Sequence, residues 1–416
     1  MRADHRRPDG TSTSVTKGAP EVVLADVQEA DEAGAVAARW AVEGRRVLAV
    51  AQDGALLGLI ALDDPVRSEA ANAIAACHRA GIRPVLVTGD HAGTAEAVAR
   101  AVGLVDDRHP VQGNVLSRVE PEGKLQVVLG WQAEGHVVAM TGDGVNDAPA
   151  LRAADIGVAM GQRGTEVAKE AADLVLADDS LATVTAAIGE GRRVFDNVRR
   201  FVGYGIAGGA SEVLVMLLGP IFGLALPLVP AQVLWVNLLT HGPVGVAMGA
   251  EPAAPDVLSR PPRRPTDGVL DRRLMWQVAG LAMAIAGSCL FVATWSRSGG
   301  GPWQTQLFVT LTAAQLLLAL ALRPVGAWRR GFSDGGAWVP AAAVGNVLLL
   351  FAGVYLPGLS NLLRTEPLSL VQLGTAGAAA LVPSALYLLG RNVHRHRSAL
   401  GAGGDPRDES PSRDRT

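Results

Sequence analysis

The sequence predicts an α/β doubly wound cytoplasmic domain followed by an all-α bundle of six transmembrane helices. Three observations support this prediction: a change in composition near residue 200, alternating strand and helix patterns before it, and a series of long apolar segments after it. Hydrophobic residues make up 49% of the 416 residues, charged residues make up 19%, and the mean hydropathy is +0.24. A wholly soluble enzyme is less apolar than this, so a membrane part is expected.

Residues 53–195 alternate short strand patterns with amphipathic helix patterns. The strands include an apolar run at 55–62, expected to be buried, and a run at 85–90. Such alternation predicts a parallel sheet covered by helices, with ligands bound at the carboxyl ends of the strands. Two TGD turns, Thr88–Asp90 and Thr141–Asp143, follow strand patterns and so provide candidate site residues.

The segments around this domain differ from it in character. Residues 15–52 predict a smaller α/β piece, whereas residues 1–14 match no assignable pattern and are expected to be disordered. The polar tail at 393–416 is also expected to be disordered. The first residues are basic and polar without an apolar run, so no signal peptide is indicated and the soluble half should be cytoplasmic. A net charge of −3 argues against a nucleic-acid partner.

Residues 196–392 contain apolar segments close to the ~20 residues that cross a bilayer as a helix. There are six of them, at about 201–224, 230–249, 274–295, 306–323, 337–357 and 369–390. Arginines gather after the second, fourth and sixth segments and are few in the other connections. The positive-inside rule then places these connections in the cytoplasm with the soluble domain and both termini. The sequence therefore predicts a multi-pass protein of the cell membrane, with the lipid bilayer as a partner.

The segment TGDGVNDAPAL at 141–151 carries the strongest chemical signal. Asp143 and Asp147 lie four residues apart around a Gly-rich turn at a strand end. Two carboxylates close together repel each other and favour a divalent cation. Mg²⁺ binds few protein carboxylates together with phosphate and water oxygens, which suits phosphoryl transfer. The alternative is a plain surface turn, because Gly, Asn and Asp are turn residues.

TGDGVNDAPAL resembles the hinge motif of the P-type ATPases, a branch of the haloacid-dehalogenase-like superfamily. The similarity continues through IGVAMGQRGTEVAKEAADLVLADD and GRRVFDNVRRF into the membrane segments. Upstream, KGAPE, DDPVR, VLVTGD and PEGKLQVV are similar to further motifs of that family in the same order. The resemblance covers roughly residues 15–390. It implies a remnant of the nucleotide-binding domain at 15–52 and a haloacid-dehalogenase-like phosphorylation domain at 53–195, followed by the membrane part of a calcium- or magnesium-pump-like ATPase.

The resemblance implies Mg²⁺ and ATP as cofactors and gives each motif residue a role. The residues assigned to phosphoryl chemistry are Thr88, Gly89, Asp90, Lys124, Asn146 and Asp147. Asp143 and Asp147 would hold Mg²⁺, and Asn146 and Asp147 would order the site. Thr88 would hydrogen-bond a phosphoryl oxygen, Gly89 would let the backbone approach, and Lys124 would pair with the phosphoryl group and its aspartate. Taken alone, Lys124 would be a solvated surface lysine and Thr88 a helix cap.

Nucleotide binding is assigned to four residues upstream. Lys17 and Gly18 lie in KGAPE, which resembles the segment that lines the adenine pocket in the family. Arg46 matches a family arginine that contacts the nucleotide. Arg67 ends DDPVR, where the family chain returns to its phosphorylation domain.

The family nucleophile, an aspartate in a DKTGT sequence, occurs nowhere in the 416 residues. In the family it precedes the nucleotide domain, so it is expected upstream of Met1, and the chain is expected to be a C-terminal fragment. Because an acyl phosphate needs that carboxylate, the chain alone should hydrolyse ATP negligibly. A separate polypeptide carrying the missing N-terminal half is therefore a further expected partner.

The resemblance also implies a transported cation bound between membrane helices. Glu212 matches a family glutamate, and Asn237 and Thr240 match the pattern WVNLxTDG, in which His241 replaces an aspartate. Gln315 is a weaker candidate ligand. Histidine in place of a carboxylate suits a transition metal, a proton-coupled step or a decayed site, whereas Ca²⁺ prefers carboxylate oxygens.

Two other functions remain open on the residues alone. A pump remnant could bind nucleotide or Mg²⁺ without turnover, as a regulatory membrane protein. A haloacid-dehalogenase-like phosphatase with an anchor would also need the missing aspartate, and it would not need six spans.

Overall fold

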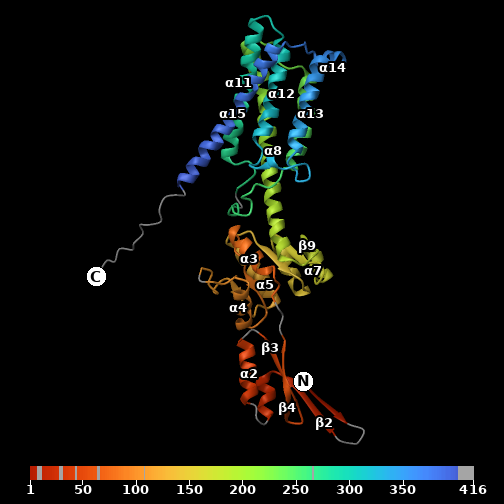
Figure 1. Ribbon diagram of the computed structural model, residues 1–416, viewed down its shortest axis with the longest axis vertical. Coiled ribbons are helices and arrows are strands. Elements are labelled where there is room, and N and C mark those ends of the chain that lie inside the picture. The colour runs from red at the N-terminus through yellow and green to blue at the C-terminus, as the bar shows by residue number, and fades with distance from the viewer. Residues whose placement is uncertain are drawn as a thin grey trace, which may run out of the picture. The chain divides into compact units, whose positions relative to one another are not determined.

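The computed structural model describes residues 1–6, 12–27, 31–42, 45–62, 66–106, 108–264 and 267–401, which form two compact units (Figure 1). The first unit comprises Met1–Gly189 and Leu258–Thr266, and the second comprises Glu190–Val257 and Asp267–Thr416. The long helix α8 (Leu181–Leu218) begins in the first unit and continues into the second. The alternating strand and helix patterns therefore lie in the first unit, and the long apolar segments lie in the second.

The first unit begins with a four-stranded antiparallel sheet of order β1-β2-β3-β4. Its elements are β1 (Arg2–Arg6), β2 (Ser12–Gly18), α1 (Pro20–Val23), a 3-10 turn at Leu24–Asp26, α2 (Asp31–Val42), β3 (Arg46–Gln52) and β4 (Ala55–Leu62). Val23, Leu24, Ala49 and Ala51 form its small core. The expectation that residues 1–14 are disordered is wrong for the described residues, because β1 and the start of β2 pair along their whole length.

The strand at 55–62 also differs from its prediction. β4 is antiparallel to β3 and belongs to the first sheet, and Leu57 is 61% exposed, although the apolar run was expected to be a buried strand of the second domain. The cause is the two-residue turn Asp53–Gly54, in which both residues have positive φ, at 51° and 82°. An Asp-Gly turn of this kind folds the chain directly into a hairpin, so no crossover helix can form.

The rest of the first unit contains parallel strands alternating with helices. Two strands, β5 (Leu86–Val87) and β6 (Val115–Leu116), form one small parallel sheet. β7 (Ala139–Gly142), β8 (Ile156–Met160) and β9 (Leu174–Leu176) form another, in that order. The helices are α3 (Ala70–Arg79), α4 (Ala92–Ala101), α5 (Pro121–Ala133), α6 (Ala148–Ala153) and α7 (Glu166–Ala171), with a 3-10 turn at Val145–Asp147. The strand and helix alternation is confirmed, but over the described residues it forms two separate sheets and not one.

Close backbone packing positions the turn after β7. Gly157 in β8 lies so near α6 that a Cβ atom there would be 2.5 Å from the carbonyl oxygen of Leu151. Leu151, Ala159 and Ala168 are fully buried and join α6, β8 and α7 in one small core. The TGDGVND turn is therefore held from both sides by packed elements.

The second unit is helical, and five of its helices are long and apolar enough to cross a membrane. These candidate spans are Leu181–Phe222, Arg272–Ser298, Trp303–Ala321, Trp338–Tyr355 and Leu370–Asn392. They correspond to α8 with its 3-10 extension, α11, α12, α13 and α15 (Leu370–Gly401). α12 packs against α11, α13 and α15 (Figure 1). In its apolar window 72% of the residues are buried, against 22% in that of α15, so α12 forms the centre of the unit and α15 lies at its surface.

The predicted second span, at 230–249, is not one continuous α-helix. It consists of α9 (Pro230–Trp235), a π-helical segment at Val236–His241 and α10 (Gly242–Gly249). Pro243 has no N–H to bond the carbonyl of Leu239, so the regular α-helical ladder cannot pass this point. π-helical turns are frequent at functional sites. Five candidate spans, and not the expected six, are found among the described residues, and 230–249 is the predicted span that is missing.

The two ends of the helical unit complete the description. α14 (Pro357–Leu363) follows α13. A 3-10 turn at Ala327–Arg329 lies between α12 and α13. α15 continues to Gly401, so the expected disorder from residue 393 is wrong up to that point. The remainder of that tail, 402–416, lies outside the described residues.

A buried ion pair fastens two of the loops between these helices. Arg323 and Glu251 have side chains that are 1% and 2% exposed, and Arg323 Nε lies 2.7 Å from Glu251 Oε1. The guanidinium of Arg323 also lies 4.3 Å from the centre of the Trp328 ring and donates to the carbonyl of Gly336. The backbone carbonyl of Glu251 accepts from Asn197 of α8 at 2.8 Å. The end of α12 is thereby joined to the loop after α10 and to α8.

Candidate functional site

In the first unit, the turn after β7 closes around the carboxylate of Asp147. Lys124 of α5 places its Nζ 2.6 Å from Asp147 Oδ1. The backbone amides of Asp143 and Gly144 both donate to Asp147 Oδ2 at 3.3 Å. Asp147 is 6% exposed, so this is a buried charge with three donors. The turn needs Gly at 142, because a Cβ there would be 2.6 Å from Asp147 Cβ.

Asp143 and Asn146 are placed differently from Asp147. Both residues are exposed, and the backbone carbonyl of Asp143 accepts from the amide of Thr165 at 2.9 Å. The carboxylate of Asp143 is therefore available at the carboxyl end of a parallel strand, where α/β sheets bind ligands.

The second turn, Thr88–Asp90, is joined to the same region through Val119. The carbonyl of Thr88 accepts from the amide of Val119 at 3.0 Å, and Val119 lies two residues before α5, which carries Lys124. The Thr88 hydroxyl lies 3.1 Å from Asp90 Oδ2 and also accepts from the Asp90 amide at 3.1 Å. Thr88 is not the cap of the next helix, since His91 accepts from the Gly93 amide in that position.

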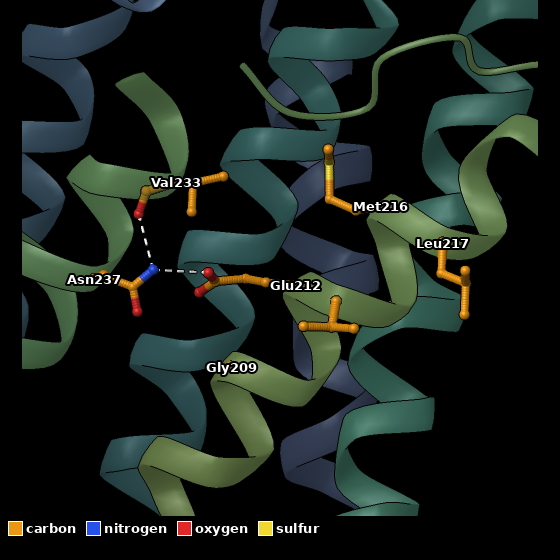
Figure 2. A pocket seen from close by; sticks show the side chains of 7 residues that line it. Gly209, Glu212, Met216, Leu217, Val233 and Asn237 are labelled. Atoms are coloured by element: carbon orange, nitrogen blue, oxygen red, sulfur yellow. Dashed lines mark hydrogen bonds between the residues drawn. The ribbon is translucent and has the colours of Figure 1, made fainter. Parts of the chain in front are cut away.

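In the second unit, Glu212 of α8 is the centre of a polar cluster. Asn237 in the π-helical segment donates to Glu212 Oε2 at 2.9 Å and to the carbonyl of Val233 at 3.0 Å, as Figure 2 shows. Gln315 of α12 donates to Glu212 Oε1 at 3.3 Å. A pocket opens beside these groups, lined by Glu212, Asn237, Gly209, Val213, Met216 and Val233 (Figure 2).

Thr240 and His241 lie in the same π-helical segment. Thr240 is fully buried. The ring of His241 meets the ring of Tyr204 edge to face at 5.2 Å. His241 Nε2 also faces Gly208 of α8, where a Cβ would come within 2.5 Å of it. All four residues predicted for the transported cation therefore lie on α8 and on the segment that interrupts the helix at 230–249.

Both units of the chain match known protein families. Residues 225–391 match the family described as cation transporting ATPase, C-terminus, and residues 7–155 and 124–188 match haloacid dehalogenase-like hydrolases. A probable cation-transporting ATPase F of Mycobacterium tuberculosis is 41% identical over 345 residues, which are 76% of this chain and 38% of that protein. The calcium-transporting ATPase of Bacillus subtilis is 36% identical over 404 residues, covering 84% of this chain and 45% of that protein.

The chain belongs to the P-type cation-transporting ATPases. It is a multi-pass membrane protein with a haloacid-dehalogenase-like region before its helical region. It spans less than half the length of the curated relatives described above.

The geometry of this ATPase fits one protein ligand for Mg²⁺ better than two. Asp143 offers a free carboxylate, whereas both oxygens of Asp147 already accept from Lys124 or from backbone amides. No group of three or more His, Cys, Asp or Glu side chains that could hold a metal occurs in the described part of the chain. Mg²⁺ is often held by one or two carboxylates together with substrate phosphates, so a single exposed carboxylate such as that of Asp143 would fit this kind of site.

The four residues assigned to nucleotide binding are divided between two places. Lys17 is exposed in β2, and Lys17 and Gly18 pair with Val50 and Ala49 of β3. Arg46 begins β3, and its side chain lies outside the described part. Arg67 donates to the backbone carbonyl of Asp179 in the loop before α8, so its guanidinium is already engaged there.

Two residues beside the polar cluster around Glu212 were not predicted from the sequence. Tyr204 and Gly208 match no motif, yet both border His241. The available signal was helical spacing: Tyr204, Gly208 and Glu212 are four residues apart and share one face of α8.

Proposed function

We propose that this chain supplies the phosphorylation domain and the C-terminal membrane helices of an ATP-driven cation pump that works through an aspartyl phosphate. The observation that carries the proposal is the Lys124–Asp147 pair, held beside the free carboxylate of Asp143 at the end of β7. Phosphoryl transfer is mostly positioning and neutralisation of charge, and this turn provides both.

The residues of the turn divide this work. Asp143 holds Mg²⁺, which when bound neutralises charge on the phosphoryl oxygens. Asp147 fixes the ammonium group of Lys124, which faces the negative phosphoryl group. Thr88 donates its hydroxyl to a phosphoryl oxygen, and Asn146 orders the exposed side of the turn. Lys17, Gly18 and Arg46 contribute to ATP binding from β2 and β3.

The phosphorylated aspartate must come from residues other than these 416, since no DKTGT sequence occurs among them. A longer form of the polypeptide or a second polypeptide would supply it. The cation crosses the bilayer by way of Glu212, Asn237, Thr240 and His241, with the interrupted helix at 230–249 completing six spans. The soluble unit and both termini lie in the cytoplasm, because the Arg-rich connections are on that side.

The test measures Mg²⁺ binding to the purified full chain in detergent by isothermal titration calorimetry. We expect Asp143→Asn to weaken binding on the order of tenfold or more, as the loss of metal-site groups does. The matched control is Glu170→Gln, which removes one exposed carboxylate from α7 of the same unit. Equal binding by wild type and Asp143→Asn would contradict the role of Asp143.

A second measurement concerns the nucleophile. With labelled ATP, the chain alone should form no acid-stable, hydroxylamine-sensitive phosphoenzyme. Addition of a polypeptide that carries the DKTGT half should restore labelling on that polypeptide. Labelling of this chain alone would overturn the proposal that its nucleophile lies elsewhere.

A further inference from the structure

Several buried side chains of the second unit have a polar atom without a partner in the part of the chain that the structure describes, and four of these side chains lie on α8, α12 and the π-helical segment. The atoms are Tyr204 OH, Thr240 Oγ1, His241 Nε2 and Gln315 Oε1. Tyr204, Thr240 and Gln315 are fully buried. A buried polar group without a hydrogen bond is costly, so several of them together point to a ligand that would satisfy them.

Two of these side chains, His241 and Gln315, meet beside Gly208, and Gln315 also contacts Glu212. Gln315 reaches Glu212 Oε1 with its Nε2 at 3.3 Å. A Cβ added to Gly208 would lie 2.5 Å from His241 Nε2 and 3.3 Å from the same Gln315 nitrogen. The absence of a side chain at Gly208 therefore leaves the space that the imidazole edge needs. Nitrogen and carboxylate donors from three helical segments thus border one buried region.

The donor set differs from that of a calcium site. Ca²⁺ takes six to eight oxygen ligands, commonly with several carboxylates. Here Glu212 is the one carboxylate among the described groups of the cluster, beside an imidazole nitrogen and neutral amide and hydroxyl oxygens. Imidazole is a preferred ligand of zinc, copper, nickel and iron, and carboxylate and carbonyl oxygens complete such sites.

We propose that this cluster binds a divalent transition-metal ion through His241 Nε2 and the Glu212 carboxylate, in preference to Ca²⁺. The proposal rests on the proposed function, since it names the class of cation that the same pump carries. Gln315 and Thr240 complete the oxygen ligands. Gly208, which has no Cβ, leaves room beside His241 Nε2.

The decisive measurement uses Co²⁺ as the probe, because its visible absorption reports nitrogen coordination. Untagged full chain in detergent is titrated with Co²⁺ and, in competition, with Ca²⁺. We expect Co²⁺ to bind at least about tenfold more tightly than Ca²⁺, with a spectrum that shows an imidazole ligand. Tighter binding of Ca²⁺, or a cobalt spectrum without nitrogen ligation, would overturn the proposal, and neither result requires a variant.

Variants then assign the ligand. His241→Asp should weaken Co²⁺ binding and strengthen Ca²⁺ binding, each on the order of tenfold. Gly208→Ala keeps every ligand but fills the space beside His241 Nε2, and should weaken Co²⁺ binding to a similar extent. His136→Gln is the control, because His136 has a side chain that is 66% exposed in the first unit. If His136→Gln has the larger effect, the cobalt site lies on the surface and the proposal is wrong.

The outcome also separates this proposal from the one before it. Ca²⁺ binding that is lost in Glu212→Gln but unchanged in His241→Asp would overturn only the choice of metal. A folded chain that binds neither Co²⁺ nor Ca²⁺ at Glu212 would overturn both the choice of metal and the cation site of the proposed pump. Circular dichroism of each variant shows whether it is folded.

Discussion

The candidate site around Asp147 and the polar cluster around Glu212 differ in how far their buried polar groups are hydrogen-bonded. At the TGDGVND turn, the carboxylate of Asp147 has a lysine and two backbone amides as donors. In the membrane cluster, Tyr204, Thr240, His241 and Gln315 each keep an atom without a partner among the described residues. A site whose own residues satisfy one another is arranged before its ligand arrives. A site with open donors and acceptors depends on its ligand for part of its stability.

The Arg323–Glu251 pair of the helical unit lies between these two cases, because its charges pair while Arg323 Nη1 and Glu251 Oε2 have no partner among the described residues. Two charges with 1% and 2% exposed side chains are stable there because they neutralise each other, and neither could remain charged alone at low cost. The pair joins loops that are far apart in sequence but not in space. It offers the largest expected effect with which to test how much the stability of the unit depends on paired buried charges.

Arg323→Ala should lower the free energy of unfolding of the helical unit by about 3–5 kcal/mol, because it leaves Glu251 buried without its charge partner. The measurement is a titration with denaturing detergent in mixed micelles, followed by circular dichroism. The double variant Arg323→Leu with Glu251→Leu should recover much of the loss, since no unpaired charge remains. Arg329→Ala is the control, because Arg329 is exposed in the same loop. A loss no larger than that of the control would show that the pair does not hold the loops.

Reading the sequence named candidate residues for both sites but not the pairings among them. The TGD turns and the segment 230–249 carry dense local motifs, so their residues could be placed without a structure. Arg323 and Glu251 are 72 positions apart and lie in loops without a motif, so no local pattern joins them. The roles of Tyr204 and Gly208 were not predicted, because both residues lie in a long apolar segment and belong to no recognised motif.

The errors in the fold have equally local causes. ALLGLIAL is apolar at every position, so its alternation between exposed and half-buried residues in β4 could not be read from composition. The Asp53–Gly54 turn before it decided the antiparallel pairing. In the helical unit, residues 230–249 are helical as expected, but their apolar length gave no sign of the π-helical segment at Val236–His241.

Lys124→Met tests the satisfied site in the first unit. It should lower the free energy of unfolding by about 2 kcal/mol, since a buried carboxylate loses its charged donor. Thermal unfolding of the full chain, followed by circular dichroism, measures the change. The control is Lys169→Met, because Lys169 makes a similar contact of 2.9 Å to Glu166, whose side chain is 83% exposed. Surface pairs of that kind contribute about 0–1 kcal/mol, so equal losses in the two variants would argue that Asp147 does not depend on Lys124.

In the polar cluster around Glu212, removing a buried hydroxyl should not lower the free energy of unfolding. Thr240→Val removes a fully buried hydroxyl that has no partner among the described residues, so without divalent metal it should leave stability unchanged or raise it by about 1 kcal/mol. Thr310→Val is the matched control, since the hydroxyl of Thr310 is equally buried but donates to the carbonyl of Gln306 at 2.7 Å. That variant should lose about 1 kcal/mol. Unfolding in EDTA compares the two, and a similar loss in both would mean that the Thr240 hydroxyl is already satisfied, which would remove one of the open donors on which the metal site depends.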